Sequence, residues 1–198
     1  MAHNLLTDRL PAELTVCGQR YPVFTDFRRW ILVTELFAEE EIPAGTKLEC
    51  AAKLIFRKPV SVDAANPAEW YHSLADGILW FVSCGKRVFT GGDGSPARSG
   101  QAEAVFDFTQ DSERILAAFR QTYGIDLGDP AVTMHFWKFM ALLRNLPRET
   151  EFMQVVNLRM TDTAKIENDD LRRRVRRAKA SVRIREEKEE RGKEKTYG

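Results

Sequence analysis

Few side chains in this 198-residue sequence could carry acid–base, nucleophilic or metal chemistry, and their spacing matches no catalytic motif. The three histidines, His3, His72 and His135, lie far apart, and the three cysteines include no CxxC pair, so the paired spacing of a zinc site is absent. No GxSxG, HExxH or GxGxxG motif occurs. The sequence therefore predicts a protein that is not an enzyme, with no catalytic residue, no metal site and no cofactor.

The ionisable residues that remain have structural explanations. His135 stands in an apolar segment beside Phe136 and Trp137, where we expect a packed or hydrogen-bonded histidine rather than a general base. Aspartates in loops or at helix ends commonly cap the main chain there. Four aspartates are expected to do so: Asp63, Asp107, Asp111 and Asp126.

A glycine-rich stretch over about residues 90–102 is the other segment whose composition could suggest a ligand. Loops of this kind can cradle phosphate, but this one lacks the GK[ST] ending of a P-loop. No strand followed by a helix surrounds it. We interpret it as a flexible loop or linker.

The periodicity of the apolar residues predicts a mainly α fold: a compact multi-helix domain with a small N-terminal β-hairpin and a charged C-terminal helix. Apolar residues alternate on both sides of Gly18, which predicts the hairpin at about residues 13–24. Six helices are expected next, because apolar residues then recur at spacings of three and four. Their expected starts are Thr25, Thr46, Asn66, Asp111, Thr133 and Pro147.

Charge divides the chain into two parts. Lys plus Arg is 30 and Asp plus Glu is 29, a net charge of +1. Residues 165–198 hold 13 basic and 8 acidic residues, which leaves a net negative charge on residues 1–164. We therefore predict a helical domain over 1–164 and a basic helical tail over 165–198 that is partly disordered at its end.

The sequence disfavours both insertion in a membrane and secretion. No apolar run approaches the roughly 18 residues that a membrane span needs. The first 20 residues also lack the basic region and apolar core of a secretory signal. We expect a cytoplasmic protein that does not bind membranes.

The tail is the candidate partner-binding segment, because five arginines in six residues accompany an apolar stripe at spacings of four, three and four. Three interpretations remain open: a solvated helix that frays, a helix that docks on a partner, and a nucleic-acid-binding helix. No aromatic residue accompanies the arginines until Tyr197, so stacking on single strands is not supported. The candidate residues are Leu171, Arg172, Arg173, Arg174, Val175, Arg176, Arg177 and Val182.

Several separate stretches between residues 10 and 165 form a distinctive ordered set. They include Thr25-Asp26-Phe27-Arg28-Arg29-Trp30, Asp107-Phe108-Thr109-Gln110-Asp111, Tyr123-Gly124-Ile125-Asp126-Leu127, His135-Phe136-Trp137-Lys138-Phe139 and Leu146-Pro147-Arg148-Glu149-Thr150. This order resembles a small tail-assembly, chaperone-like protein family of siphovirus bacteriophages and prophages. Genes of that family usually lie between those of the major tail protein and the tape measure.

The chain departs from the family's pattern in two respects. Phe136 replaces the first of two consecutive tryptophans that often follow the histidine. The glycine-rich loop and the charged end from about Arg183 resemble additions.

The resemblance implies a non-enzymatic chaperone that coats the helical, aggregation-prone tape-measure protein and gives way as the tail tube polymerises. Its implied partners are the tape-measure protein and the major tail (tube) protein, and self-association is plausible. The motif residues, including Phe27, Trp137 and Phe139, are expected to be structural. One alternative is a structural subunit that stays in the mature tail. A nucleic-acid-binding protein that uses the arginines of the tail is the other.

Overall fold

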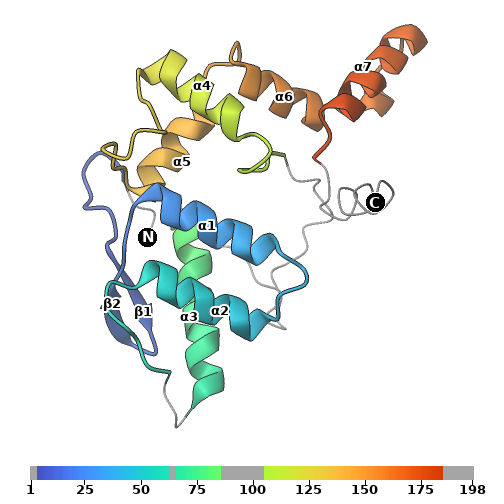
Figure 1. Cartoon of the computed structure of the whole chain (residues 1–198). Helices are drawn as coiled ribbons and strands as arrows, with labels where there is room; N and C mark the ends of the chain where they lie inside the picture. Colours follow the sequence, from blue (N-terminus) through green and yellow to red (C-terminus); the bar gives the residue numbers. More distant parts are fainter. Residues whose placement is uncertain (1–3, 63–65, 86–104, 185–198) are drawn as a thin grey trace, which may run out of the picture. The chain divides into compact units, whose positions relative to one another are not determined.

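The computed structural model describes residues 4–62, 66–85 and 105–184, and within them the fold is mainly α, as predicted (Figure 1). The glycine-rich segment at 90–102, Asp63 and the end of the predicted tail lie outside the described residues. The elements are β1 (Glu13–Val16), β2 (Gln19–Pro22), α1 (Phe27–Ala38), α2 (Ala44–Ile55), α3 (Pro67–Val82), α4 (Ser112–Tyr123), α5 (Phe136–Arg144), α6 (Glu151–Met160), the short 3₁₀ helix η1 (Thr163–Lys165) and α7 (Asp169–Ser181).

The contacts group the chain into two units. The first unit comprises Met1–Ser99 and Asp129–Asn145, and it contains the hairpin, α1, α2, α3 and α5. The second comprises Gly100–Gly128 and Leu146–Gly198, and it contains α4, α6, η1 and α7. The boundary predicted from charge, at residue 164, falls inside the second unit.

The predicted hairpin is present as an antiparallel pair in which Leu14 lies opposite Tyr21. Its two-residue turn places Cys17 at φ 48° and Gly18 at φ 76°. Two successive positive φ values suit the right-handed twist of the strands, and glycine adopts the second without a steric penalty. Alternation then buries Leu14 and Val16 on one face of β1.

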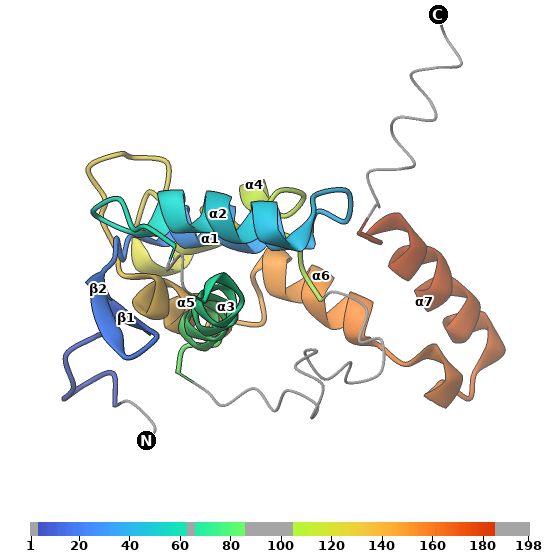
Figure 2. The ribbon, with the colours of Figure 1, turned by 90° about the horizontal axis from the view of Figure 1, so that it is seen from below.

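Four aromatic side chains form the centre of the first unit. The Trp30 ring stacks on Phe81 with the ring centroids 3.8 Å apart, and Phe136 lies against both rings. The Trp137 indole N–H donates to the Phe81 carbonyl at 2.8 Å, so this buried polar group is paired. In Figure 2, α1 and α2 run side by side above α3, which is seen along its axis.

The third predicted helix begins as expected, because Asn66 accepts a hydrogen bond from the Glu69 N–H and Pro67 occupies the first turn. Two other predicted starts were wrong. The helix expected at Thr46 begins at Ala44 after Pro43, with no side-chain cap. The helix expected at Pro147 begins at Glu151, where the Thr150 hydroxyl accepts from the Met153 N–H.

The starts predicted at Thr25 and Thr133 were also wrong, because α1 begins at Phe27 and α5 begins at Phe136. Asp26 is the residue that caps α1, through its bond from the Arg28 N–H, and His135 caps α5 through Nδ1, which accepts from the Trp137 N–H. The main chain explains both shifts. Hydrogen bonds between residues 25–27 and 134–136 form a bridge between Asp26 and His135, and both of these residues are extended, so each helix begins only after them.

In the second unit α4 packs against α6, and α6 packs against α7. The buried apolar residues of α4 and α6 are Ile115, Ala118, Phe119, Phe152, Val155 and Val156. Phe106, from the segment before α4, meets Phe152 edge to face with ring centroids 5.8 Å apart. Gly124 ends α4 at φ 66°, the left-handed conformation that glycine adopts most readily.

The central packing of the first unit gives a stability prediction. All four tryptophans lie in this unit, so tryptophan fluorescence reports its unfolding. Trp30→Ala removes a fully buried ring and should lower the free energy of unfolding by about 3–5 kcal/mol. Leu32→Ala, on the same helix but 50% exposed, should cost at most about 1 kcal/mol. Equal losses in urea titrations of the two variants would contradict this packing.

Candidate functional site

Helix α7 is the element that carries the predicted partner-binding residues. Asn168 caps it by accepting from the Leu171 N–H at 2.9 Å, and Asp169 and Asp170 stand in its first turn, where negative charge suits the helix dipole. No residue of α7 is buried. Isolated helices of this length are marginally stable in water, so contacts with its surroundings must hold α7 in place.

Three basic side chains on one face of α7 bind the chain that precedes it. Arg172 donates to the Ile166 carbonyl at 3.1 Å, and Lys179 donates to the Thr161 carbonyl at 3.4 Å. Arg176 reaches the Thr163 hydroxyl at 3.5 Å. These positions are three or four residues apart, so they line one side of the helix, which we call the inward face.

The arginine cluster is therefore divided between two faces, a distinction that composition alone does not reveal. Arg173, Arg174 and Arg177 lie on the opposite side, which we call the outward face, and all three are exposed. Arg173 forms a 3.5 Å ion pair with Asp170. The side chains of Arg174 and Arg177 form no hydrogen bond or ion pair with another described residue.

The residues of the predicted apolar stripe differ in how far they are buried. Val175, Ala178 and Val182 are half-buried, whereas Leu171 is 52% exposed. Val175 shares the side of the helix that carries Arg172 and Lys179, which binds the chain's own preceding segment. Of the stripe, Leu171 is the residue most available to a partner.

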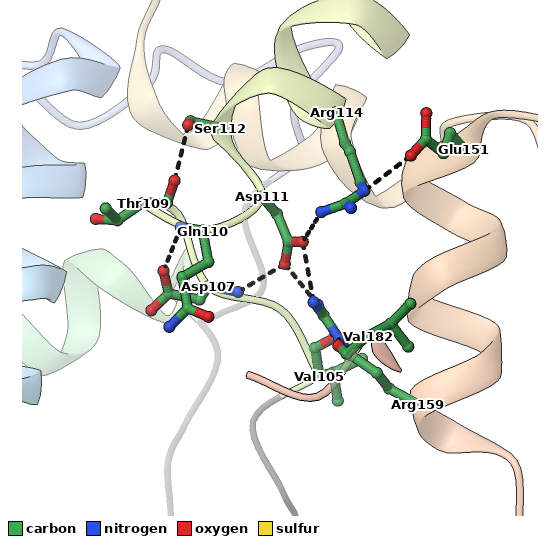
Figure 3. Close-up of polar contacts among 10 residues, drawn as sticks. All are labelled: Val105, Asp107, Thr109, Gln110, Asp111, Ser112, Arg114, Glu151, Arg159 and Val182. Carbon is green, nitrogen blue, oxygen red and sulfur yellow. Dashed lines mark hydrogen bonds and ion pairs between the residues drawn. The ribbon is translucent and has the colours of Figure 1, made fainter. Parts of the chain in front are cut away.

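The C-terminal end of α7 is fixed by Arg159, the anchor of the second unit (Figure 3). The Arg159 Nε donates to the Val182 carbonyl at 2.6 Å. Its Nη1 and Nη2 bind the two carboxylate oxygens of Asp111 at 2.5 and 3.0 Å, and Nη1 also donates to the Val105 carbonyl at 3.3 Å. One guanidinium thus joins α6 to the end of α7 and to the segment that precedes α4.

The carboxylate in this arrangement, that of Asp111, is fully buried. Besides Arg159 it accepts from the Asp107 N–H at 3.1 Å and pairs with Arg114 at 3.1 Å. Burial alone would raise the pKa of Asp111, but the hydrogen bonds from Arg159 and the Asp107 main chain, with the positive charges of Arg159 and Arg114, lower it below its usual value.

The prediction that the Asp111 side chain caps a helix was wrong. Asp111 does precede α4, but its side chain makes no cap hydrogen bond because both oxygens face Arg159 and Arg114. A signal for this pair was present in the sequence. Arg159 continues the three- and four-residue spacing of Phe152, Val155 and Val156, so a charged residue falls on the buried face of α6.

The other predicted aspartates act locally. Asp107 accepts from the Gln110 N–H at 2.7 Å, as expected for a turn residue. Asp126 accepts from the Gly128 N–H at 2.9 Å and pairs with Arg120 at 3.2 Å on the surface. The motif that contains Asp126 surrounds the end of α4. Tyr123 packs edge to face on Phe119 there. The motif then continues through Gly124, Ile125 and Leu127.

Two of the motif stretches meet in the first unit. The Phe27 N–H donates to the Met134 carbonyl at 2.9 Å, and the Phe136 N–H donates to the Thr25 carbonyl at 2.8 Å. The Phe27 ring stacks on Phe139 with centroids 4.8 Å apart. These contacts join the starts of α1 and α5, and they assign these motif residues to packing within the unit.

Two further motif residues, Arg28 and Trp137, stabilise the first unit near the starts of α1 and α5, whereas Lys138 does not. Arg28 donates to the Val132 and Asp129 carbonyls at 2.8 and 2.9 Å, which fixes the segment before α5. Trp137 is buried against Phe81. Lys138 is exposed on α5.

His135 has a defined hydrogen-bonding role at this junction. Its Nδ1 accepts from the Trp137 N–H at 3.1 Å, so Nε2 carries the proton and donates to the Pro11 carbonyl at 2.9 Å. Burial lowers the pKa of His135, against a smaller opposing effect of the Pro11 bond. A proton on Nδ1 would also remove the acceptor that caps α5.

Among the described residues no group of three or more His, Cys, Asp or Glu side chains could hold a metal ion. No helix within residues 4–62, 66–85 and 105–184 combines the length and apolarity that crossing a membrane requires.

The site is thus a basic helix anchored at the edge of a helical unit by a buried ion pair. The chain belongs to the family described as Bacteriophage Gp15 protein, which its sequence matches over residues 6–184. It is therefore a bacteriophage protein, and the family points to a structural or assembly role. Comparisons with curated proteins and with solved structures found no match.

The buried pair of Arg159 and Asp111 gives a stability prediction, and the exposed pair of Arg120 and Asp126 is its control. Arg159→Met leaves the buried Asp111 carboxylate without its main partner and should lower the free energy of unfolding by about 3–5 kcal/mol. Arg120→Met removes the same group from the exposed pair with Asp126 and should cost at most about 1 kcal/mol. Urea unfolding followed by circular dichroism checks both values, and similar costs would show that the buried pair is not an anchor.

The lowered pKa of His135 predicts that the stability of the first unit depends on pH. Because its pKa is lower in the folded chain than the ordinary 6.5, the unfolded chain binds the proton more readily. Stability should therefore be complete above pH 6.5 and decline as pH falls toward the folded pKa, by at most about 1.4 kcal/mol per pH unit.

His135→Asn tests this prediction, since asparagine caps helices but does not titrate near pH 6. Tryptophan-detected urea unfolding at pH 7.5 and 5.5 should show a smaller difference for the variant than for the unaltered chain. An unchanged difference would assign the acid sensitivity to another group.

Proposed function

We propose that this protein is a non-enzymatic tail-assembly chaperone of a bacteriophage or prophage. In this role it binds the helical tape-measure protein, keeps it soluble, and releases it as tube subunits polymerise. The bacterial host cytoplasm is where this assembly takes place. The observation that carries the proposal is α7, a basic helix with no buried residue, in a chain of a bacteriophage family.

The hydrogen bonds that hold α7 suit a chaperone because they lie along one face and at one end of the helix. Its inward face binds main-chain carbonyls at Thr161 and Ile166, and its end is held by Arg159. The outward arginines and Leu171 remain exposed. Exposed charges and one apolar side chain give weak contacts, which a growing tube can displace.

The first unit is held together by its stacked aromatic centre and by the junction of α1 with α5. The proposal needs no catalytic group. It assigns partner contact to the second unit, with the tape-measure protein as the principal partner and the major tail protein as the second.

Co-expression with a tape-measure fragment from the same phage is the direct test. The fragment should stay soluble with this protein, aggregate without it, and co-purify with it. Equal aggregation in both cases would contradict the proposal. Mass spectrometry of purified virions then separates a chaperone, which should be absent, from a structural tail subunit, which should be present.

A matched pair of leucine variants locates the contact. Leu171→Glu places a negative charge at the exposed apolar position of α7 and should reduce the co-purified fragment severalfold. Leu6→Glu makes the same change at a residue of the first unit that is 94% exposed, and it should leave co-purification unchanged. If both variants lose the fragment equally, the contact does not lie on α7.

A further inference from the structure

The outward face of α7 has a chemistry that selects its partner. Arg173 and Arg177 lie four residues apart along the helix, and Arg174 lies beside them. Leu171 precedes Arg174 by three residues, so it borders the basic surface. This outward face combines three positive charges with one apolar edge over a helix about 20 Å long.

The charge of this face excludes one obvious occupant, another copy of the same face. Pairing two α7 helices through their outward faces would bring Arg174 and Arg177 against their counterparts, and like charges at close range disfavour that arrangement. The inward face is not an alternative, because Arg172 and Lys179 already bind the preceding segment. A partner that binds the outward face would therefore carry negative charge.

We propose that the outward face of α7 binds an acidic amphipathic helix. Acidic side chains one turn apart on such a helix would pair with Arg174 and Arg177, while an apolar residue on the same side would cover Leu171. The inference rests on the proposed function only in taking the natural partner to be a helical phage protein.

A protein helix fits this face better than nucleic acid does. Asp169 and Asp170 stand at the start of the same helix, where they would repel a phosphate backbone. Asp170 also pairs with Arg173, which lowers the positive charge that the face presents. The half-exposed Leu171 offers nothing to a phosphate but contributes to a protein contact.

Fluorescence anisotropy with the full chain at low ionic strength tests the proposal with three labelled probes. The first is a helical peptide of about 20 residues with leucine at heptad spacing and glutamate beside it. The second replaces each glutamate with lysine, and the third is duplex DNA. We expect binding of the acidic peptide alone, weakening as salt is added.

Variants of equal charge identify the surface. Arg174→Ala with Arg177→Ala should weaken binding of the acidic peptide about tenfold, a loss consistent with two removed ion pairs. Arg148→Ala with Lys165→Ala removes the same charge from exposed residues of the same unit outside α7, and should change binding by less than about twofold. Arg174→Lys with Arg177→Lys should retain most of the affinity.

Three results would overturn the inference: no binding of the acidic peptide, equal loss in the two alanine pairs, or tighter binding of DNA. Its failure is distinct from that of the proposed function. A chain that binds the acidic peptide yet leaves the tape-measure fragment insoluble contradicts the chaperone proposal and keeps this inference. A chain that keeps the fragment soluble but does not bind the peptide contradicts this inference and keeps the chaperone proposal.

Discussion

The guanidinium of Arg159 holds together the second unit, because its charge is buried and must be fully paired. Asp111 neutralises it through two hydrogen bonds, and the Val105 and Val182 carbonyls accept from it as well. These partners come from the segment that precedes α4 and from the end of α7, so pairing one side chain of α6 brings three parts of the chain together. A consequence is that the end of α7 is fixed by a polar contact rather than by an apolar core. The helix can therefore be held in place while it keeps its outward face exposed to solvent.

The first unit depends on main-chain pairing instead of a buried charge. The exchange between Thr25 and Phe136, and between Phe27 and Met134, joins two segments more than 100 residues apart. Side chains then complete the junction, since Asp26 and His135 cap the two helices that leave it. The motif residues of this unit are thus among the residues that build it. Their polar groups therefore cap helices and their rings pack within the unit.

The sequence was sufficient to predict the elements that local spacing determines. The hairpin around Gly18 and the helix that starts at Asn66 follow from turn chemistry and from a capping box, both of which act within a few residues. The caps at Asp26 and His135 were missed because a distant main-chain contact decides them. The Asp111–Arg159 pair was missed for the same reason, although Arg159 on an apolar face was a visible sign of a buried partner. The division of the arginines between two faces depends on which side of α7 meets the preceding segment, and composition carries no information about that.

The central claim is that Arg159 positions α7. Hydrogen–deuterium exchange of the full chain, with and without the Arg159→Met substitution, tests it most directly. The amides of residues 171–181 should lose protection in the variant, while those of α1 and α3, in the other unit, should keep theirs. Unchanged protection across α7 in the variant would contradict the account, because the helix would then be held without its anchor.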